Sequence, residues 1–386
     1  MKMKLYKKLF LPAVIMPIFL IGFELGGFQL ALLSAANEFG INKEVMGSLV
    51  AAQFLAIALA PLFFGRLSDR TGKKRIILIF MVVYIVGCSM AASPGTIWLF
   101  VVGVFVVGVG FSVVESTVMA AVADAYEERS EKYLNFLQVF LGIGAVVSPL
   151  ILQAVLRVSP GFWRASFLIC AIAMAVSIPF ILFSYFKPAP EAVREEQKPK
   201  AGNILVLLSF VFCMFIYMGV ENGIAFYADS IFVLELNEPS FGAYAISLIW
   251  GFMAIARFFF GTRKKVPRLA VPISLFLLAC FMAGIIFCEN AIIMLCLFAA
   301  CGAACGCVLP GIISAATSRY PAASGAVSSY CFVGGGFGGA FIPVLLGGVI
   351  GFTGISGSFV IMVAVAIVIG IIMWRNRIAA DRITIN

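Results

Sequence analysis

The segment Gly65-Arg66-Leu67-Ser68-Asp69-Arg70-Thr71-Gly72-Lys73-Lys74-Arg75 separates two apolar runs, 45–64 and 76–93. Gly65 and Gly72 allow a tight turn and a close approach of helices. Asp69 can accept hydrogen bonds at a helix N-terminus, where its charge favours the helix dipole, and Arg70 can pair with a carboxylate. The segment can therefore act as a latch that is made and broken, or as a basic loop that only fixes orientation.

The apolar runs on either side belong to a series that continues along the whole chain. Each run is long enough to cross a bilayer as a helix of about 20 residues. The twelve runs are 9–35, 45–64, 76–93, 96–122, 134–156, 163–186, 204–232, 241–262, 269–288, 291–314, 324–349 and 354–374. With 63% hydrophobic and only 12% charged residues, the composition excludes an ordinary soluble domain. We predict an all-α integral membrane protein with twelve transmembrane helices.

The basic residues gather on one side of these predicted spans. Of 27 Lys and Arg residues, Lys43, Arg157 and Arg164 fall on the opposite side, and Arg257 lies within the eighth run. By the positive-inside rule, this asymmetry predicts that both termini are cytoplasmic. We therefore attribute the net charge of +9 to topology rather than to nucleic-acid binding, and expect a multi-pass protein of the cell membrane.

The runs divide into two groups of six. We predict an N-terminal six-helix half at 1–186, a cytoplasmic linker at 187–203 and a C-terminal six-helix half at 204–386. The linker segment Lys187–Lys200 is rich in proline and alternating charge, which is typical of a segment without a fold of its own. Two helical repeats around a site near the bilayer midplane are a common plan of secondary transporters.

Several classes of chemistry are excluded by composition. The chain has no histidine, which removes the usual zinc ligand, the Ser/His/Asp triad and imidazole proton relays. Its ten cysteines lie in or at the edges of apolar runs, where small residues pack helices closely. No nucleophile beside a base can be recognised. We expect neither an enzyme nor a bound metal or cofactor.

Three carboxylates lie deep in predicted spans, at Glu24, Glu115 and Glu221. An ionised acid at the centre of a span costs roughly 2.5–3.5 kcal/mol, so these groups should face a cavity or carry a proton. A carboxyl group at low dielectric holds its proton more readily, as a proton-coupled carrier requires. The alternative is that each is a protonated clamp that bridges helices by hydrogen bonds.

Other polar side chains within the runs form candidate solute ligands. Amides suit hydroxyl groups, and aromatic faces suit the flat apolar side of a sugar ring. The candidates are Gln29, Asn135, Gln138, Tyr217, Asn222 and Tyr227. The amides can instead be bonds between helices, and the tyrosines interfacial anchors. Because no lysine lies within the runs and Arg257 lies near a cytoplasmic end, we expect no anionic solute.

The segment Gly65–Arg75 resembles the signature loop of the major facilitator superfamily, G-x-L-x-D-R-x-G-[RK]-[RK]. The resemblance covers the whole chain and implies the fold of that superfamily. It also implies that Gly65, Asp69, Arg70 and Gly72 form a gate that holds the cytoplasmic side closed.

Within the superfamily, the pattern Leu134-Asn135-x-x-Gln138-x-Phe140-x-x-x-Gly144-Ala145 resembles helix five of the fucose:proton symporter group. The acids of helices one and four, Tyr217-x-Gly219-x-Glu221 and the glycine-rich run 334–340 resemble the same group. The resemblance implies proton coupling or sugar contact for Glu24 and Glu115, and sugar binding for Gln138. Leu141 departs from it, because the symporter can carry another polar ligand there.

These features predict a secondary transporter that moves a small polar solute, a sugar by preference, in symport with a proton by alternating access. Residue types alone leave sodium open as the coupling ion, and we expect a monomer in the lipid bilayer. The alternative is a proton-driven exporter of drugs or other lipophilic compounds. Exporters commonly carry G-x-x-x-G-P-x-x-G-G in helix five, and the corresponding segment Gly144–Pro149 has no following glycine pair.

Overall fold

The computed structural model describes residues 2–42, 45–93, 95–126, 130–186, 204–261, 269–320 and 324–383. All regular elements within these ranges are helices. The chain separates into two compact units, of which the first comprises Met1–Asn42 and Leu49–Val193 and the second comprises Lys43–Ser48 and Arg194–Asn386. The predicted linker 187–203 lies outside the described residues. The boundaries predicted for two six-helix halves stay a prediction.

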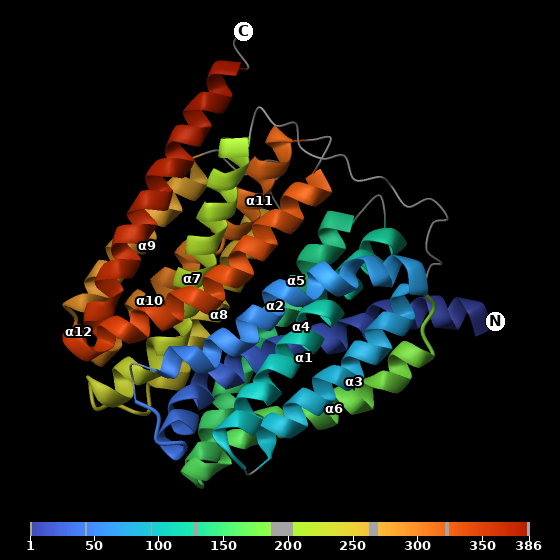
Figure 1. The fold of residues 1–386 in the computed structure, drawn as a ribbon, viewed down its shortest axis with the longest axis horizontal. Coiled ribbons are helices and arrows are strands. Elements are labelled where there is room, and N and C mark those ends of the chain that lie inside the picture. The colour runs from blue at the N-terminus through green and yellow to red at the C-terminus, as the bar shows by residue number, and fades with distance from the viewer. Residues whose placement is uncertain are drawn as a thin grey trace. The chain divides into compact units, whose positions relative to one another are not determined.

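The helices, drawn in Figure 1, have bounds close to those of the apolar runs. The first part of the chain forms α1 (Lys2–Glu38), α2 (Met46–Thr71), α3 (Lys73–Ala92), α4 (Ile97–Ala125), α5 (Ser130–Leu156), the short 3₁₀ helix η2 (Pro160–Arg164) and α6 (Ala165–Leu182). The second part forms α7 (Ile204–Leu234), α8 (Gly242–Gly261), α9 (Ala270–Ile286), α10 (Ala291–Cys305), α11 (Val308–Arg319) and α12 (Ser324–Ile383). In the described residues, ten helical segments are long and apolar enough to cross a membrane, and α9 is a shorter apolar helix.

The structure corrects the loop expected at 65–75. The backbone of α2 stays helical through Thr71, and α3 begins at Lys73. The turn is confined to Gly72, whose φ of 92° is a conformation that glycine adopts without strain. Gly72 therefore makes the turn by itself, whereas the backbone at Gly65 is helical.

Two further apolar runs differ from straight helices. The run 291–314 is interrupted between α10 and α11, at Gly306 and Cys307. The runs 324–349 and 354–374 lie in α12, which is broken at Gly354, where φ is 74°. Both breaks contain a glycine, which weakens a helix and permits unusual backbone angles.

In unit 1, helices α1 and α5 approach each other at glycines. A Cβ atom at Gly22 would overlap the backbone of Leu141, and one at Gly144 would overlap the backbone of Phe19. Such close contact through small residues is the usual way in which helices pack inside a membrane, where no hydrophobic effect drives them together. This contact sets the rotation of α1 about its own axis, and therefore the direction in which Glu24 points relative to α5.

The second part of α12 begins on a carboxylate from the end of α7. Glu235 accepts hydrogen bonds from the backbone N–H groups of Ile355 and Ser356, directly after the break at Gly354. The Ser356 hydroxyl also donates to this carboxylate. Glu235 thus satisfies N–H groups that a helix start leaves open, and its charge complements the dipole.

We expect the Glu235→Ala substitution to lower the stability of unit 2 by about 1 kcal/mol, the usual cost of losing a helix cap. Thermal unfolding of the purified protein in detergent would show a midpoint lower by about 2–4 °C. Glu238→Ala is the matched control, because Glu238 is an exposed acid of the same loop without a side-chain hydrogen bond to any described residue. Equal midpoints for the two variants would contradict the capping role.

Candidate functional site

Glu24 in α1 is bound by a neutral amide from α2. The Nε2 group of Gln53 donates a hydrogen bond of 2.9 Å to Oε2 of Glu24. Glu24 is 1% exposed and Gln53 is fully buried. The other carboxylate oxygen, Oε1, has no hydrogen-bond partner among the residues that the structure describes. An ionised carboxylate in such a place would be costly, because a single amide compensates little of its charge.

Glu115 in α4 and Gln138 in α5 form a second pair of the same kind. Gln138 Nε2 donates to Glu115 Oε1 over 3.2 Å, and both side chains are half-buried. Sequence reasoning assigned the acid to proton coupling and the amide to solute binding. The structure brings the two together within unit 1, so a proton on Glu115 would alter the bond that orients Gln138.

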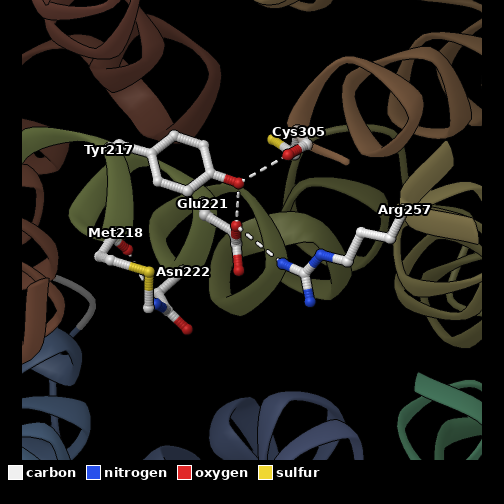
Figure 2. Close-up of polar contacts among 6 residues, drawn as sticks. All are labelled: Tyr217, Met218, Glu221, Asn222, Arg257 and Cys305. Carbon is white, nitrogen blue, oxygen red and sulfur yellow. Dashed lines mark hydrogen bonds and ion pairs between the residues drawn. The ribbon is translucent and has the colours of Figure 1, made fainter. Parts of the chain in front are cut away.

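The third acid, Glu221, lies in a cluster in unit 2 (Figure 2). Tyr217, one turn earlier in α7, is hydrogen-bonded to Oε2 of Glu221. The Tyr217 hydroxyl also lies 2.9 Å from the backbone carbonyl of Cys305, at the end of α10. Tyr217 and Glu221 both belong to the buried core. Residues four apart share a face of a helix, which explains why the tyrosine reaches the acid.

Arg257 completes this cluster. Its Nη2 atom lies 3.5 Å from Oε2 of Glu221, and Figure 2 shows the guanidinium directed from α8 toward the carboxylate. The Nε atom of Arg257 is buried without a hydrogen-bond partner in the described part of the chain. In the sequence, Arg257 lies near the predicted cytoplasmic end of the run 241–262, and no partner for it could be predicted there. The structure instead pairs it with a membrane carboxylate, as intramembrane charges commonly are.

The remaining four candidate ligands have surroundings of different kinds. Asn222 donates to the Met218 carbonyl of its own helix over 2.8 Å, and Tyr227 donates to the Pro343 carbonyl in α12 over 2.9 Å. Gln29 is fully buried in α1, whereas Asn135 is exposed on α5. The hydroxyl of Tyr227 is therefore engaged by backbone, which favours packing over solute contact. A solute-binding role for these four residues stays a prediction.

Of the predicted gate residues, Gly65, Asp69 and Arg70 have side-chain positions outside the described residues, and Gly72 is the turn described above. The lysines that follow have definite partners. Lys73 pairs with Asp124 and donates to the Ala120 carbonyl over 3.3 Å, near the end of α4. Lys74 donates to the carbonyls of Leu182 and Ser184 over 2.7 and 3.0 Å, at the end of α6. Basic groups are favoured at helix C-termini, so both lysines stabilise the ends of neighbouring helices.

Comparison with known proteins identifies the family. The sequence profile described as "Major Facilitator Superfamily" matches residues 14–329, most of the chain. This chain belongs to the major facilitator superfamily. Membership places it among multi-pass membrane transporters and not among enzymes, and it confirms the resemblance noted for the segment Gly65–Arg75.

Two curated bacterial proteins illustrate the sequence similarity of this chain to known proteins. Multidrug resistance protein D of Escherichia coli is 23% identical over 55% of this chain and 59% of its own length. The glucose/mannose transporter GlcP of Bacillus subtilis is 23% identical over 82% of this chain and 81% of its own. This chain spans about half of the length of several other curated relatives.

Two solved structures of transporters share the fold of this chain. The xylose transporter XylE from Escherichia coli has a TM-score of 0.79 and 14% identity, covering 96% of this chain and 97% of its own. The transporter FucP, solved in the outward conformation, has a TM-score of 0.68 and 17% identity, covering 95% of this chain and 98% of its own. At such identities the likeness establishes the superfamily fold alone.

Sequence reasoning missed two polar groups of this superfamily member that a stricter search of the runs would have found. Gln53 is an amide within the run 45–64, and Asp229 is a fourth carboxylate within the run 204–232. Asp229 is 7% exposed and packs against Gly242, at the start of α8. No sequence signal points to the Cys305 carbonyl, because a backbone group becomes a partner only through packing.

Proposed function

We propose that this chain carries a small polar solute, a sugar by preference, in symport with a proton by alternating access. One observation carries this proposal, namely the burial of Glu24 against the amide of Gln53. In the described residues Glu24 forms no ion pair with a cation. A buried carboxyl group without a cation is stable only when it holds a proton. Glu24 would therefore gain and lose its proton as water reaches it from one side or the other.

A topology of twelve spans is part of the proposal. Ten helical segments have the length and composition of a span, and one of them, Val327–Asn376, is 50 residues long and contains the break at Gly354. Since about 20 residues suffice to cross a bilayer, this segment supports two spans, and α9 supports one more. We propose a monomer in the cell membrane with both termini in the cytoplasm.

The neutral amide at Gln138 supports a polar, hydroxyl-rich solute. An amide presents both donors and an acceptor, which matches the hydroxyl groups of a sugar. The relative GlcP is named as a glucose/mannose transporter, and the match to it covers most of both chains. We propose that Gln138 binds a solute hydroxyl and that Glu115, through its hydrogen bond, links this contact to a proton.

The experiment is uptake by the purified protein in liposomes. We expect labelled hexoses or related polyols to accumulate when the outside is more acidic than the inside, and each addition of solute to unbuffered vesicles to alkalinise the medium. Empty liposomes are the control. A broad panel of neutral sugars that neither enters nor moves protons would refute sugar symport.

The second candidate is a proton-driven exporter, which is favoured by the similarity to multidrug resistance protein D. The same liposomes distinguish the two. An exporter would move a lipophilic dye in the direction opposite to the flow of protons and would not transport sugars. Its cavity would bind apolar surface rather than hydroxyl groups.

A further inference from the structure

The cluster around Tyr217 in unit 2 contains one hydroxyl hydrogen and two acceptors. The Tyr217 hydroxyl lies within hydrogen-bond distance of the Glu221 carboxylate and of the Cys305 carbonyl (Figure 2). A phenol hydroxyl can donate one hydrogen bond, although its oxygen can also accept. A backbone carbonyl only accepts, and so does an ionised carboxylate. The two bonds can therefore form together only when Glu221 supplies a hydrogen of its own.

Two arrangements of hydrogens follow from this. When Glu221 is ionised, it accepts the hydrogen bond from the Tyr217 hydroxyl, and Tyr217 no longer donates to the Cys305 carbonyl. When Glu221 is protonated, its O–H donates to the Tyr217 oxygen and Tyr217 donates to Cys305.

The Cys305 carbonyl stands at the break between α10 and α11. Gly306 bonds back to the Ala303 carbonyl over 3.3 Å, and α11 resumes at Val308. Pro310 lacks the N–H that would continue the helical bonding across the break. Gly306 itself packs on the backbone of α8 beside Arg257, where a Cβ atom would have no room. The donor from Tyr217 thus ties α7 to the least regular point of the α10–α11 segment.

We propose that Tyr217 is a positioning residue that couples the proton on Glu221 to the α10–α11 break. With the proton present, the break is held to α7 through Cys305, and with the proton absent this bond is released. The inference rests on the proton-coupled function proposed above, because it treats Glu221 as a group that gains and loses a proton. It replaces the expectation that Tyr217 is a solute ligand.

The side chains around Glu221 offer no second path by which its protonation could affect the α10–α11 break. Tyr217 contacts it from α7 and Arg257 from α8, and Cys305 of α10, which carries a titratable thiol, contacts Tyr217 through its carbonyl. From the described parts of α11 and α12, no charged or titratable side chain contacts Glu221. A change of pH that alters the break should therefore act through Glu221 and Tyr217.

The test is hydrogen–deuterium exchange of the peptide 303–311 in lipid nanodiscs at two pH values, corrected for intrinsic exchange. In the unchanged protein we expect about three- to tenfold slower exchange at the lower pH, which is the factor that one hydrogen bond confers. Y217F should exchange rapidly at both pH values. E221Q should exchange slowly at both, because its amide can donate permanently to the Tyr217 oxygen.

Y227F is the matched control, because Tyr227 is also buried in α7 but donates to a backbone carbonyl with no acid beside it. It should keep the pH dependence of the peptide 303–311. A pH dependence that survives in Y217F would overturn the proposal. If Y217F does not fold, E221Q decides alone, and a retained pH dependence in E221Q would overturn it as well.

The measurement needs no solute, so the two proposals fail separately. If the pH effect is found and depends on Tyr217, but no solute moves protons, the transport proposal is wrong and the coupling stands. If proton-driven uptake is found and Y217F shows the pH profile of Y227F, the coupling is wrong and the transport proposal stands.

Discussion

Glu24→Gln is expected to abolish solute accumulation driven by a pH gradient while leaving solute exchange intact. A gradient of one pH unit can sustain about tenfold accumulation when one proton accompanies each solute molecule. A glutamine cannot carry that proton, so the ratio should fall to about one. It has nearly the shape of a protonated glutamate, and the Gln53 amide can turn to offer its oxygen, which now has no partner among the described residues.

The measurement combines two assays on the same liposomes. Accumulation under a pH gradient should be lost in Glu24→Gln, whereas counterflow of labelled against unlabelled solute at equal pH should continue. Glu38→Gln is the control, because Glu38 ends the same helix in an exposed ion pair with Arg164 at 2.5 Å. Such pairs contribute little, so both activities should persist. Normal accumulation by Glu24→Gln would exclude Glu24 as the proton carrier.

Gly338→Val is expected to disrupt the packing of unit 2. A Cβ atom at Gly338 in α12 would overlap the carbonyl of Phe215 in α7, and backbone cannot move aside as a flexible side chain can. Overpacking of this kind costs about 1–3 kcal/mol, and a branched side chain against backbone should reach the upper end. We expect an unfolding midpoint about 6–12 °C lower, or protein that fails to purify.

Gly348→Val separates this effect from helix propensity. Gly348 lies in the same helix, and a Cβ atom there would meet no other atom within 4 Å. Both variants replace a helical glycine by the same residue, so their intrinsic helix propensities change equally. Thermal unfolding in detergent should leave Gly348→Val close to the unchanged protein. Similar midpoints for the two variants would show that the contact between α7 and α12 is not what limits stability.

Much of the candidate site could be foreseen, but the contacts between residues of different helices could not. Acidic residues within apolar runs are candidates because their charge is costly there, and Glu24, Glu115 and Glu221 were predicted on this ground. The same criterion also applies to Asp229. The pair of Tyr217 and Glu221 is readable as well, because it lies within one helix turn. The partner of Glu24 is Gln53, 29 residues away, and the Cys305 carbonyl is 88 residues from Tyr217. Nothing local in the sequence relates such positions.

The sequence by itself determined that the chain is helical, where most helices begin and end, and to which superfamily it belongs. A bilayer makes these features local, because every span must satisfy its own backbone and supply about 20 apolar residues. Only the tertiary structure decided that the turn is confined to Gly72, that the helix breaks at Gly306 and that Arg257 pairs with Glu221. These depend on how each helix is rotated against its neighbour, which is set by contacts such as Gly22 on Leu141 between residues far apart in the chain.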